Sequence, residues 1–258
     1  MSRVVLITGA SAGIGYQAAL AFARAGYDVV GTARRAERLA ELAAAIDVLP
    51  APHGAFLPVQ ADVSSRQAMQ DAARACEERF GRLDVLIANA GIGQRGALAD
   101  SPWEDIEQVL RTNIDGVIHS IQAAVPLMRR SGGGHILTVS SVVFNLVSPY
   151  AATYAATKAF VSSLAASIRH ELADDNIRLT DFLVGRTATE FNQRRLGAGK
   201  RSTDNLPTMS AERVATALLA AVGTRRQTVI LRWFDRLIVL GNRLVPNLIG
   251  QMAKRQYK

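Results

Sequence analysis

Two side chains near the middle of the chain could transfer a proton. Tyr154 and Lys158 are four residues apart in a predicted helix, so their side chains lie on one face, one turn apart. A phenol has a pKa of about 10 and is a poor base near neutral pH. A neighbouring ammonium favours the phenolate, so we expect Lys158 to lower the pKa of Tyr154. The pair could then exchange a proton with an alcohol or carbonyl oxygen. For an isolated tyrosine and lysine at this spacing, an exposed helix pair is the alternative.

A serine strengthens the chemical interpretation of this pair. Ser141 stands thirteen residues before Tyr154, at the carboxyl end of a predicted strand over 135–140. Ligands of open α/β sheets bind outside the carboxyl ends of the strands, so Ser141 is expected to point into the same crevice. Its hydroxyl could hold a substrate oxygen.

A glycine-rich turn near the N-terminus predicts a dinucleotide site. An apolar run over 4–7 leads into a turn with Gly9, Gly13 and Gly15, and a helical pattern follows. Glycines allow the backbone to approach a pyrophosphate, and the helix N-terminus offers free N–H groups to it. The predicted contacts in this turn are Gly9, Ser11, Gly13, Ile14 and Gly15. A tight turn in which glycine relieves close packing is the alternative.

The end of the second predicted strand favours NADP over NAD. NAD sites place a carboxylate there for the ribose 2′-hydroxyl, but this strand ends at Arg34 and Arg35, with no acid. Two guanidiniums suit a 2′-phosphate, unless they simply begin a solvated helix. Asp62 and Val63, after the third strand, are expected at the adenine. Alternatively, Asp62 or the neighbouring Ser64 caps the next helix.

The elements that would position these residues alternate between strands and helices. We predict strands over 4–7, 27–32, 56–60, 85–88, 135–140 and 177–184, and helices over 16–25, 36–46, 66–80, 103–130 and 154–174. Alternating elements with near-continuous apolar strands indicate a doubly wound α/β fold, with a mostly parallel sheet covered by helices on both faces. We expect one Rossmann-like domain over 1–230, with a substrate loop at about 186–208, and a separate extension over 231–258.

Composition and charge narrow the function classes. Of 258 residues, 49% are hydrophobic and 20% charged, which is typical of a globular protein. Residues 190–258 hold 13 basic and 4 acidic residues, a net +9, whereas residues 1–189 carry a net −1. A basic terminal segment on a neutral body argues against nucleic acid as the main ligand. The single cysteine excludes an internal disulfide, and the four histidines lack metal-ligand spacing. No secretory signal or membrane span is predicted, and a cytoplasmic location is expected.

The basic extension is amphipathic. Leu237, Leu240, Leu244 and Leu248 are spaced to share one helical face, although Gly241 and Pro246 are expected to break the helix. Basic residues and two aromatics, Trp233 and Phe234, accompany them. Such a segment over 232–258 packs on its own domain or a partner subunit, or it lies on an anionic membrane surface.

Taken together, these motifs resemble the short-chain dehydrogenase/reductase family over about residues 3–190. The resemblance rests on the glycine turn, Asp62, Asn89-Ala90-Gly91, Asn113, Ser141 and the Tyr154/Lys158 pair. It implies that Tyr154 is the general acid/base, that Lys158 tunes the tyrosine and holds the nicotinamide ribose, and that Ser141 orients the substrate oxygen. Asn113 would hold a water that links Lys158 to solvent. Asparagine is disfavoured inside a helix, so we also expect a helix distortion there. Asn89, Ala90 and Gly91 would pack beside the cofactor.

The chain departs from the family pattern in two places. Val184-Gly185 replaces the usual Pro-Gly, which is expected to loosen the loop, although Gly185, Thr187 and Thr189 remain candidates to meet the nicotinamide. Phe144 stands where the family often has glycine. Phe144 and Tyr150 suggest an apolar substrate wall, with packing of the loop as the alternative.

These observations predict an NADP(H)-dependent oxidoreductase that acts on a carbonyl or alcohol of an apolar small molecule. Family members are commonly dimers or tetramers that assemble through the two long helices. The resemblance therefore implies a homodimer or homotetramer. The alternative is a non-catalytic NADPH-binding regulatory or membrane-surface protein on the same fold, because a fold does not fix a function.

Overall fold

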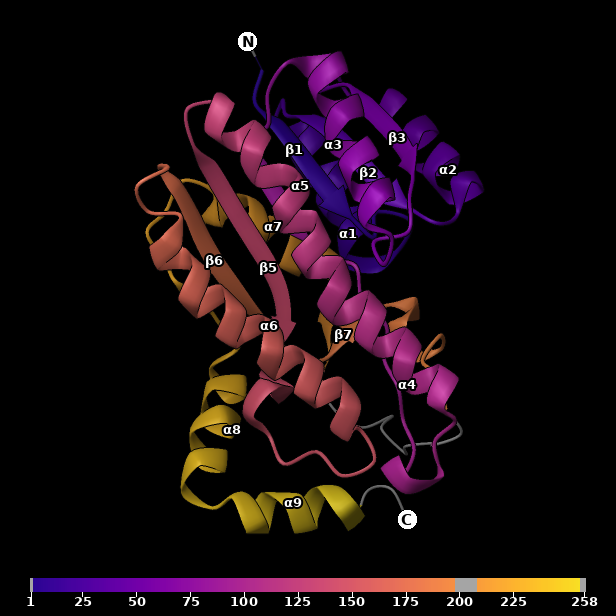
Figure 1. The fold of residues 1–258 in the computed structure, drawn as a ribbon, viewed down its shortest axis with the longest axis vertical. Coiled ribbons are helices and arrows are strands. Elements are labelled where there is room, and N and C mark those ends of the chain that lie inside the picture. The colour runs from indigo at the N-terminus through magenta and orange to yellow at the C-terminus, as the bar shows by residue number, and fades with distance from the viewer. Residues whose placement is uncertain (1, 198–207, 256–258) are drawn as a thin grey trace.

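A seven-stranded parallel sheet forms the centre of the molecule. The computed structural model describes residues 2–197 and 208–255, and part of the predicted substrate loop lies outside them. The sheet order is β3-β2-β1-β4-β5-β6-β9, with all neighbouring strands parallel (Figure 1). The strands are β1 (Val4–Thr8), β2 (Asp28–Ala33), β3 (Phe56–Gln60), β4 (Val85–Ala88), β5 (Gly134–Ser141), β6 (Ile177–Val184) and β9 (Thr228–Val229). The predicted doubly wound fold is confirmed.

Helices cover both faces of this sheet. One core holds α1 (Gly13–Arg24), α2 (Ala36–Asp47) and α7 (Ala211–Ala221), and the other holds α3 (Arg66–Phe80), α5 (Gly116–Arg130) and α6 (Ala152–Glu171). In β1, Val5 and Ile7 enter the first core, whereas Val4 and Leu6 enter the second. Because both faces are buried, the strands have the continuous apolar runs seen in the sequence.

The long predicted helix over 103–130 is interrupted. Helix α4 (Trp103–Leu110) passes into a π-helical turn, η2 (Arg111–Asp115), and then into α5. Asn113 lies in this turn, which confirms the expected distortion. Such a turn admits one extra residue and redirects the side chains around it.

Short elements connect the strands to the site. They are η1 (Leu98–Asp100), η3 (Val142–Asn145), η4 (Glu190–Asn192) and the small parallel pair β7 (Thr187–Ala188) and β8 (Met209–Ser210). The sequence analysis missed β7, β8, β9 and α7. The alternative that Asp62 or Ser64 caps α3 is wrong, because Ser65 makes the capping bond, accepting from the backbone N–H of Ala68 at 3.2 Å.

The C-terminal extension forms two helices, α8 (Trp233–Leu244) and α9 (Pro246–Arg255), at the end of the molecule opposite the N-terminus (Figure 1). The expected break at Pro246 is confirmed, since it starts α9. The expected break at Gly241 is wrong, because α8 continues through it. Within residues 2–197 and 208–255, no helix is both long and apolar enough to cross a bilayer.

Candidate active site

Ser141, Tyr154 and Lys158 come together at the carboxyl end of β5. Ser141 ends β5, and Tyr154 and Lys158 stand on the first turns of α6, which packs on that strand. The Ser141 hydroxyl donates to the Val184 carbonyl at 3.1 Å and lies close enough to Tyr154 to favour its phenolate. The Nζ atom of Lys158 lies 5.9 Å from the centre of the Tyr154 ring and donates to the Val139 carbonyl at 2.9 Å. The three residues selected by spacing therefore share one site.

Burial controls the ionisation of this site. Desolvation raises the pKa of Tyr154 to about 12, although the nearby Ser141 hydroxyl acts in the opposite direction. The expected net lowering of the Tyr154 pKa is therefore wrong for this structure, because desolvation outweighs the groups that favour the phenolate. Burial also lowers the pKa of Lys158 to about 8, against the carboxylate of Asp181, which raises it. The phenol consequently keeps its proton at neutral pH, and the lysine titrates just above neutrality.

Asp181 is a functional candidate that the sequence analysis missed. It lies on β6, is 3% exposed and accepts three hydroxyl hydrogen bonds. The donors are Thr138 at 2.8 Å, Ser140 at 3.1 Å and Ser162 at 2.6 Å. Hydrogen bonds to a carboxylate of this kind are short and strong, and they fix the position of the side chain. No motif marks it, because its partners come from two other elements, β5 and α6.

Asp181→Asn should shift the pH profile. Asparagine keeps the shape of the side chain but removes the charge that supports the Lys158 ammonium. The pKa of Lys158 should fall, so the alkaline decline of kcat/KM should begin at lower pH, with kcat at neutral pH changed less than about threefold. Steady-state kinetics across neutral and alkaline pH would measure this shift. Asp71→Asn, on the exposed surface of α3, is the matched control. If a folded Asp181→Asn protein kept the wild-type pH profile, Asp181 would have no role in setting the pKa of Lys158.

Asn113 is fixed beside Lys158 by the π-helical turn. Its amide oxygen accepts from the Ile92 N–H at 2.8 Å, and its amide nitrogen donates to the Ile92 carbonyl at 2.9 Å and to Thr157 at 3.0 Å. Gly91 lies between the two side chains. A Cβ atom on Gly91 would stand 3.2 Å from the Asn113 oxygen and 3.5 Å from Lys158 Nζ. The structure thus brings Asn113, Gly91 and Lys158 together, and the water-holding role of Asn113 stays a prediction.

The predicted glycine turn packs against the end of β4. Asn89 donates to the Thr8 carbonyl at 2.9 Å, and Ala90 N–H donates to the Thr8 hydroxyl at 3.1 Å. A Cβ atom on Gly15 would stand 2.7 Å from the Asn89 amide nitrogen, so close packing alone requires a glycine there. Gly9, by contrast, has a φ of 70°, which favours glycine.

The far side of this turn meets the loop after β6. Gly13 has a φ of 56°, and a Cβ atom there would stand 3.0 Å from the Thr189 methyl group. Thr189 itself caps η4, accepting from Phe191 N–H at 3.3 Å. Two predicted cofactor contacts from distant parts of the chain, Gly13 and Thr189, are therefore neighbours.

The N-terminus of α1 and the end of β2 suit an anion. Helix α1 has no side-chain cap and no acidic residue in its first turn, which includes Ile14. Arg35 reaches the turn and donates to the Ser11 hydroxyl at 2.9 Å. Uncapped N–H groups, a hydroxyl and a guanidinium form a donor set that fits a dinucleotide carrying phosphates.

The carboxylate of Glu190 pairs with three arginines. The distances are 3.6 Å to Arg35, 3.5 Å to Arg38 and 3.0 Å to Arg194. The sequence analysis did not select Glu190, which lies far from the glycine turn in sequence. Its position shows where a second anionic group would meet Arg35.

Only some of the remaining residues predicted at the adenine side of the cofactor contact one another. Arg34 is exposed and lies 3.9 Å from Asp62, whose carboxylate accepts from the Ser64 N–H and hydroxyl at 2.9 and 2.8 Å. Val63 is buried against Gly116 at the start of α5. Asp62 therefore organises the turn before α3, although Ser65 caps that helix.

Gly185 is held by the C-terminal extension. A Cβ atom there would overlap the Asp235 carboxylate and would stand 2.6 Å from an Arg232 guanidinium nitrogen. Arg232 and Asp235 form a two-bond ion pair at 2.6 and 2.7 Å, and Asp235 is 1% exposed. The expected loosening is thus countered by a buried ion pair on this loop. Thr187, two residues on, donates back to the Gly185 carbonyl at 3.0 Å.

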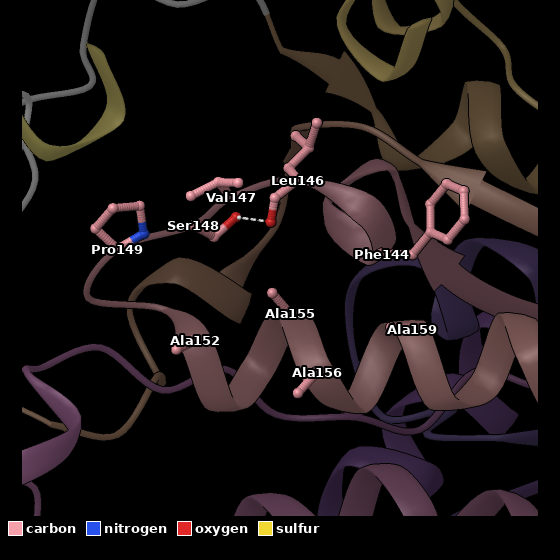
Figure 2. Close-up of a pocket in the computed structure, with 9 residues that line it drawn as sticks. All are labelled: Phe144, Leu146, Val147, Ser148, Pro149, Ala152, Ala155, Ala156 and Ala159. Carbon is pink, nitrogen blue, oxygen red and sulfur yellow. Dashed lines mark hydrogen bonds between the residues drawn. The ribbon is translucent and has the colours of Figure 1, made fainter. Parts of the chain in front are cut away.

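The predicted apolar wall divides into two parts. Figure 2 shows Phe144, Leu146 and Val147 over the alanines of α6, around a cavity of about 420 Å³ that has neither Ser141 nor Tyr154 in its lining. Tyr150 is also outside that lining. It has a φ of 60°, and its carbonyl accepts from Gly96.

An unpredicted aromatic lies directly on the reactive tyrosine. The rings of Phe191 and Tyr154 are 5.6 Å apart, with an interplanar angle of 55°. Phe191 belongs to η4 and also packs against Gly93. The only sequence feature that pointed to Phe191 was its place within the predicted substrate loop.

Comparisons with known proteins agree with this geometry. Residues 3–198 match the profile of a family described as short chain dehydrogenase. The chain is 35% identical over 212 residues to sulfoacetaldehyde reductase 2 of Chromohalobacter salexigens, covering 80% of this chain and 81% of that one. It is similar to an alcohol dehydrogenase of Thermococcus sibiricus solved with 5-hydroxy-NADP (TM-score 0.80, 27% identity, coverage 90% and 97%). It is also similar to the Brucella melitensis 3-ketoacyl-(acyl-carrier-protein) reductase solved with NADH (TM-score 0.77, 26% identity, coverage 88% and 94%).

Proposed function

Because the chain belongs to the short-chain dehydrogenase/reductase family, we propose that it is an NADP(H)-dependent oxidoreductase acting on a carbonyl or alcohol of an apolar small molecule. The observation that carries this proposal is the cluster at the end of β5. Ser141 lies beside Tyr154, and the Lys158 ammonium lies 5.9 Å from the centre of the tyrosine ring. Binding alone needs no such acid/base group.

The residues at the glycine turn would hold the cofactor. The N-terminus of α1 and Ser11 would meet phosphates, Arg34 and Arg35 would meet the 2′-phosphate, and Lys158 would meet the nicotinamide ribose. The absence of an acid at the end of β2 supports NADP, since a carboxylate there would repel the phosphate. When bound, the nicotinamide supplies or accepts the hydride.

Tyr154 would move the proton. In the reductive direction its phenol, which is protonated at neutral pH because burial raises its pKa to about 12, donates to the carbonyl oxygen. The Ser141 hydroxyl orients that oxygen. The Lys158 ammonium stabilises the phenolate that forms, and this effect is large in a buried site. These states favour reduction near neutral pH.

The walls around the tyrosine support an apolar substrate. Phe191 lies on the Tyr154 ring, and the cavity lined by Phe144, Leu146 and Val147 adjoins the same end of α6. Apolar side chains with a few convergent polar groups are typical of small-molecule sites. The substrate we propose is therefore an apolar ketone or aldehyde, or the corresponding alcohol.

Replacing Arg34 and Arg35 with alanine should reverse the cofactor preference. Hydrogen bonds to a charged group are worth about 1.5–3 kcal/mol, so the Kd for NADPH should rise about 10- to 100-fold while the Kd for NADH changes little. Fluorescence titration with each cofactor would measure both constants. Arg24→Ala, at the exposed end of α1, is the matched control. Equal weakening of NADPH and NADH binding would contradict a 2′-phosphate contact.

The function itself is tested by turnover. NADPH consumption is followed by absorbance over a panel of apolar ketones, aldehydes and quinones, beside NADH. We expect turnover with NADPH and weaker turnover with NADH. Tight NADPH binding without turnover on any member of the panel would favour the non-catalytic alternative.

A further inference from the structure

Helix α8 packs against the protein through two buried polar side chains, and α9 packs through a glycine. Asp235 on α8 is buried in its ion pair with Arg232 against Gly185. Asn242 lies about two helical turns further along α8. Its side chain accepts from Val147 N–H at 3.2 Å and donates to the Asn145 carbonyl. On α9, Gly250 is buried against Val147, since a Cβ atom there would stand 2.7 Å from a Val147 methyl group. These contacts fix how both helices are turned.

The opposite face of the two helices is apolar and open to solvent. On α8 it follows an i, i+4, i+7, i+11 stripe, and on α9 it continues with two residues four apart. The exposed side chains are Trp233 (72%), Phe234, Leu237, Leu240, Leu244 (74%), Leu248 and Met252. We call this set the C-terminal apolar face. Figure 1 shows α8 and α9 together at one end of the molecule.

Such an arrangement reverses the usual burial of a surface helix. Each large apolar side chain left in water forgoes the stabilisation that burial would give it, and a contiguous apolar face rimmed by polar residues marks an interaction surface. The polar anchors Asp235 and Asn242 prevent the helices from rotating this face inward. The face is therefore built for contact with something outside the chain.

Charge indicates what that partner is. Residues 231–258 contain six basic residues and one acidic residue, and that acid, Asp235, is buried and paired. Among the described residues, Arg236, Lys254 and Arg255 are exposed beside the apolar face, and Arg225 and Arg226 lie just before it. A second copy of the chain would present the same positive charge, which disfavours pairing of this face with itself. An anionic lipid surface complements it.

The aromatic residues and a cavity at the start of α8 fit the same partner. Tryptophan is enriched at the headgroup level of membranes, and Trp233 is among the most exposed residues of this face. A cavity of about 430 Å³ is lined by Arg213, Leu231, Arg232, Trp233 and Phe234. Apolar walls with guanidiniums beside them suit a lipid chain and its phosphate.

We propose that α8 and α9 lie in the plane of an anionic membrane, with the C-terminal apolar face in the headgroup and acyl boundary. This inference goes beyond the proposed activity and does not depend on it. Because η3 contacts both α6 and α8, the attached surface adjoins the cavity lined by Phe144, Leu146 and Val147. An apolar substrate dissolved in the bilayer would then need only a short transfer.

Co-sedimentation of the full chain with vesicles tests the proposal. We expect binding to phosphatidylglycerol/phosphatidylcholine vesicles and none to pure phosphatidylcholine. Leu237→Gln/Leu244→Gln/Leu248→Gln and, separately, Lys254→Glu/Arg255→Glu should each lower the partition coefficient about tenfold or more. The matched controls are Val48→Gln and Arg24→Glu/Arg66→Glu, which change exposed residues in or beside α1, α2 and α3, away from α8 and α9 (Figure 1), and should bind like the wild type.

Three results would overturn the proposal. The first is a wild-type chain that stays in the supernatant with phosphatidylglycerol vesicles, and the second is binding by both variants that matches the wild type. The third is light scattering that shows a wild-type oligomer reduced to monomer by the triple glutamine variant, because a second copy would then cover the face. If the triple variant fails a thermal-melting check, the charge-reversal variant, which alters only exposed residues, decides the outcome.

Discussion

Tyr154→Phe is expected to lower kcat for carbonyl reduction by about 10²–10⁴-fold while leaving NADPH affinity within about twofold. Phenylalanine keeps the ring that contacts Phe191 at 5.6 Å, so packing is preserved. The variant loses the hydroxyl that lies beside Ser141 and that we propose donates the proton. Single-turnover kinetics at saturating NADPH would isolate the chemical step, and fluorescence titration would measure cofactor affinity.

A matched control separates this effect from loss of any buried phenol. Tyr27 is also buried, with its ring against Phe22 and its pKa raised by burial, but it lies in the first core away from β5. Tyr27→Phe should retain kcat within about twofold. If Tyr154→Phe retained wild-type turnover, the proton would come from another group, and the proposed role of Tyr154 would be withdrawn.

Lys158→Met should produce the second-largest loss, about 10²–10³-fold in kcat/KM. Methionine has a similar length but no charge, so the phenolate formed at Tyr154 loses its stabilising ammonium. The wild-type kcat/KM should decline as pH rises through about 8, because the lysine whose pKa burial lowers to about 8 then loses its proton. This alkaline decline should be absent in the residual activity of Lys158→Met. A pH series of kcat/KM for both proteins measures it.

Stability provides a check on this variant. Burial disfavours the Lys158 ammonium, so replacing it with an apolar chain should leave Tm within a few degrees. Lys254→Met, on the exposed end of α9, is the control and should keep both the rate and the pH profile in solution. A Lys158→Met protein that keeps the wild-type alkaline decline would show that another group titrates.

Periodicity and motif spacing predicted the fold well, because both report local rules. The strand over 56–60, the helix over 66–80 and the strand over 85–88 have the bounds expected from their apolar patterns. The poor helix propensity of Asn113 predicted a helix distortion, and the structure has a π-helical turn there. Ser141, Tyr154 and Lys158 were expected together because parallel strands end at one edge, and the structure places them there.

The features that were missed depend on burial and on contacts between distant segments. The direction of the Tyr154 pKa shift follows from desolvation, which a four-residue spacing does not reveal. Asp181 can be recognised as a functional candidate only in the fold, where β5 and α6 bring three hydroxyl groups to its carboxylate. Glu190 and Arg35 meet across most of the chain. The apolar stripe of α8 was read correctly, but only Asp235 and Asn242 show which way it faces.

The contact between Gly185 and the Arg232–Asp235 pair has a consequence for how the protein is made. Gly185 belongs to the loop expected to border the nicotinamide, while its neighbours Arg232 and Asp235 are synthesised roughly fifty residues after it. A nascent chain can build β1 to β6 early, yet this loop stays unsupported until Asp235 has cleared the ribosome exit tunnel. A chain released shortly before residue 235 would therefore contain Ser141, Tyr154 and Lys158 but would lack the ion pair that packs on Gly185.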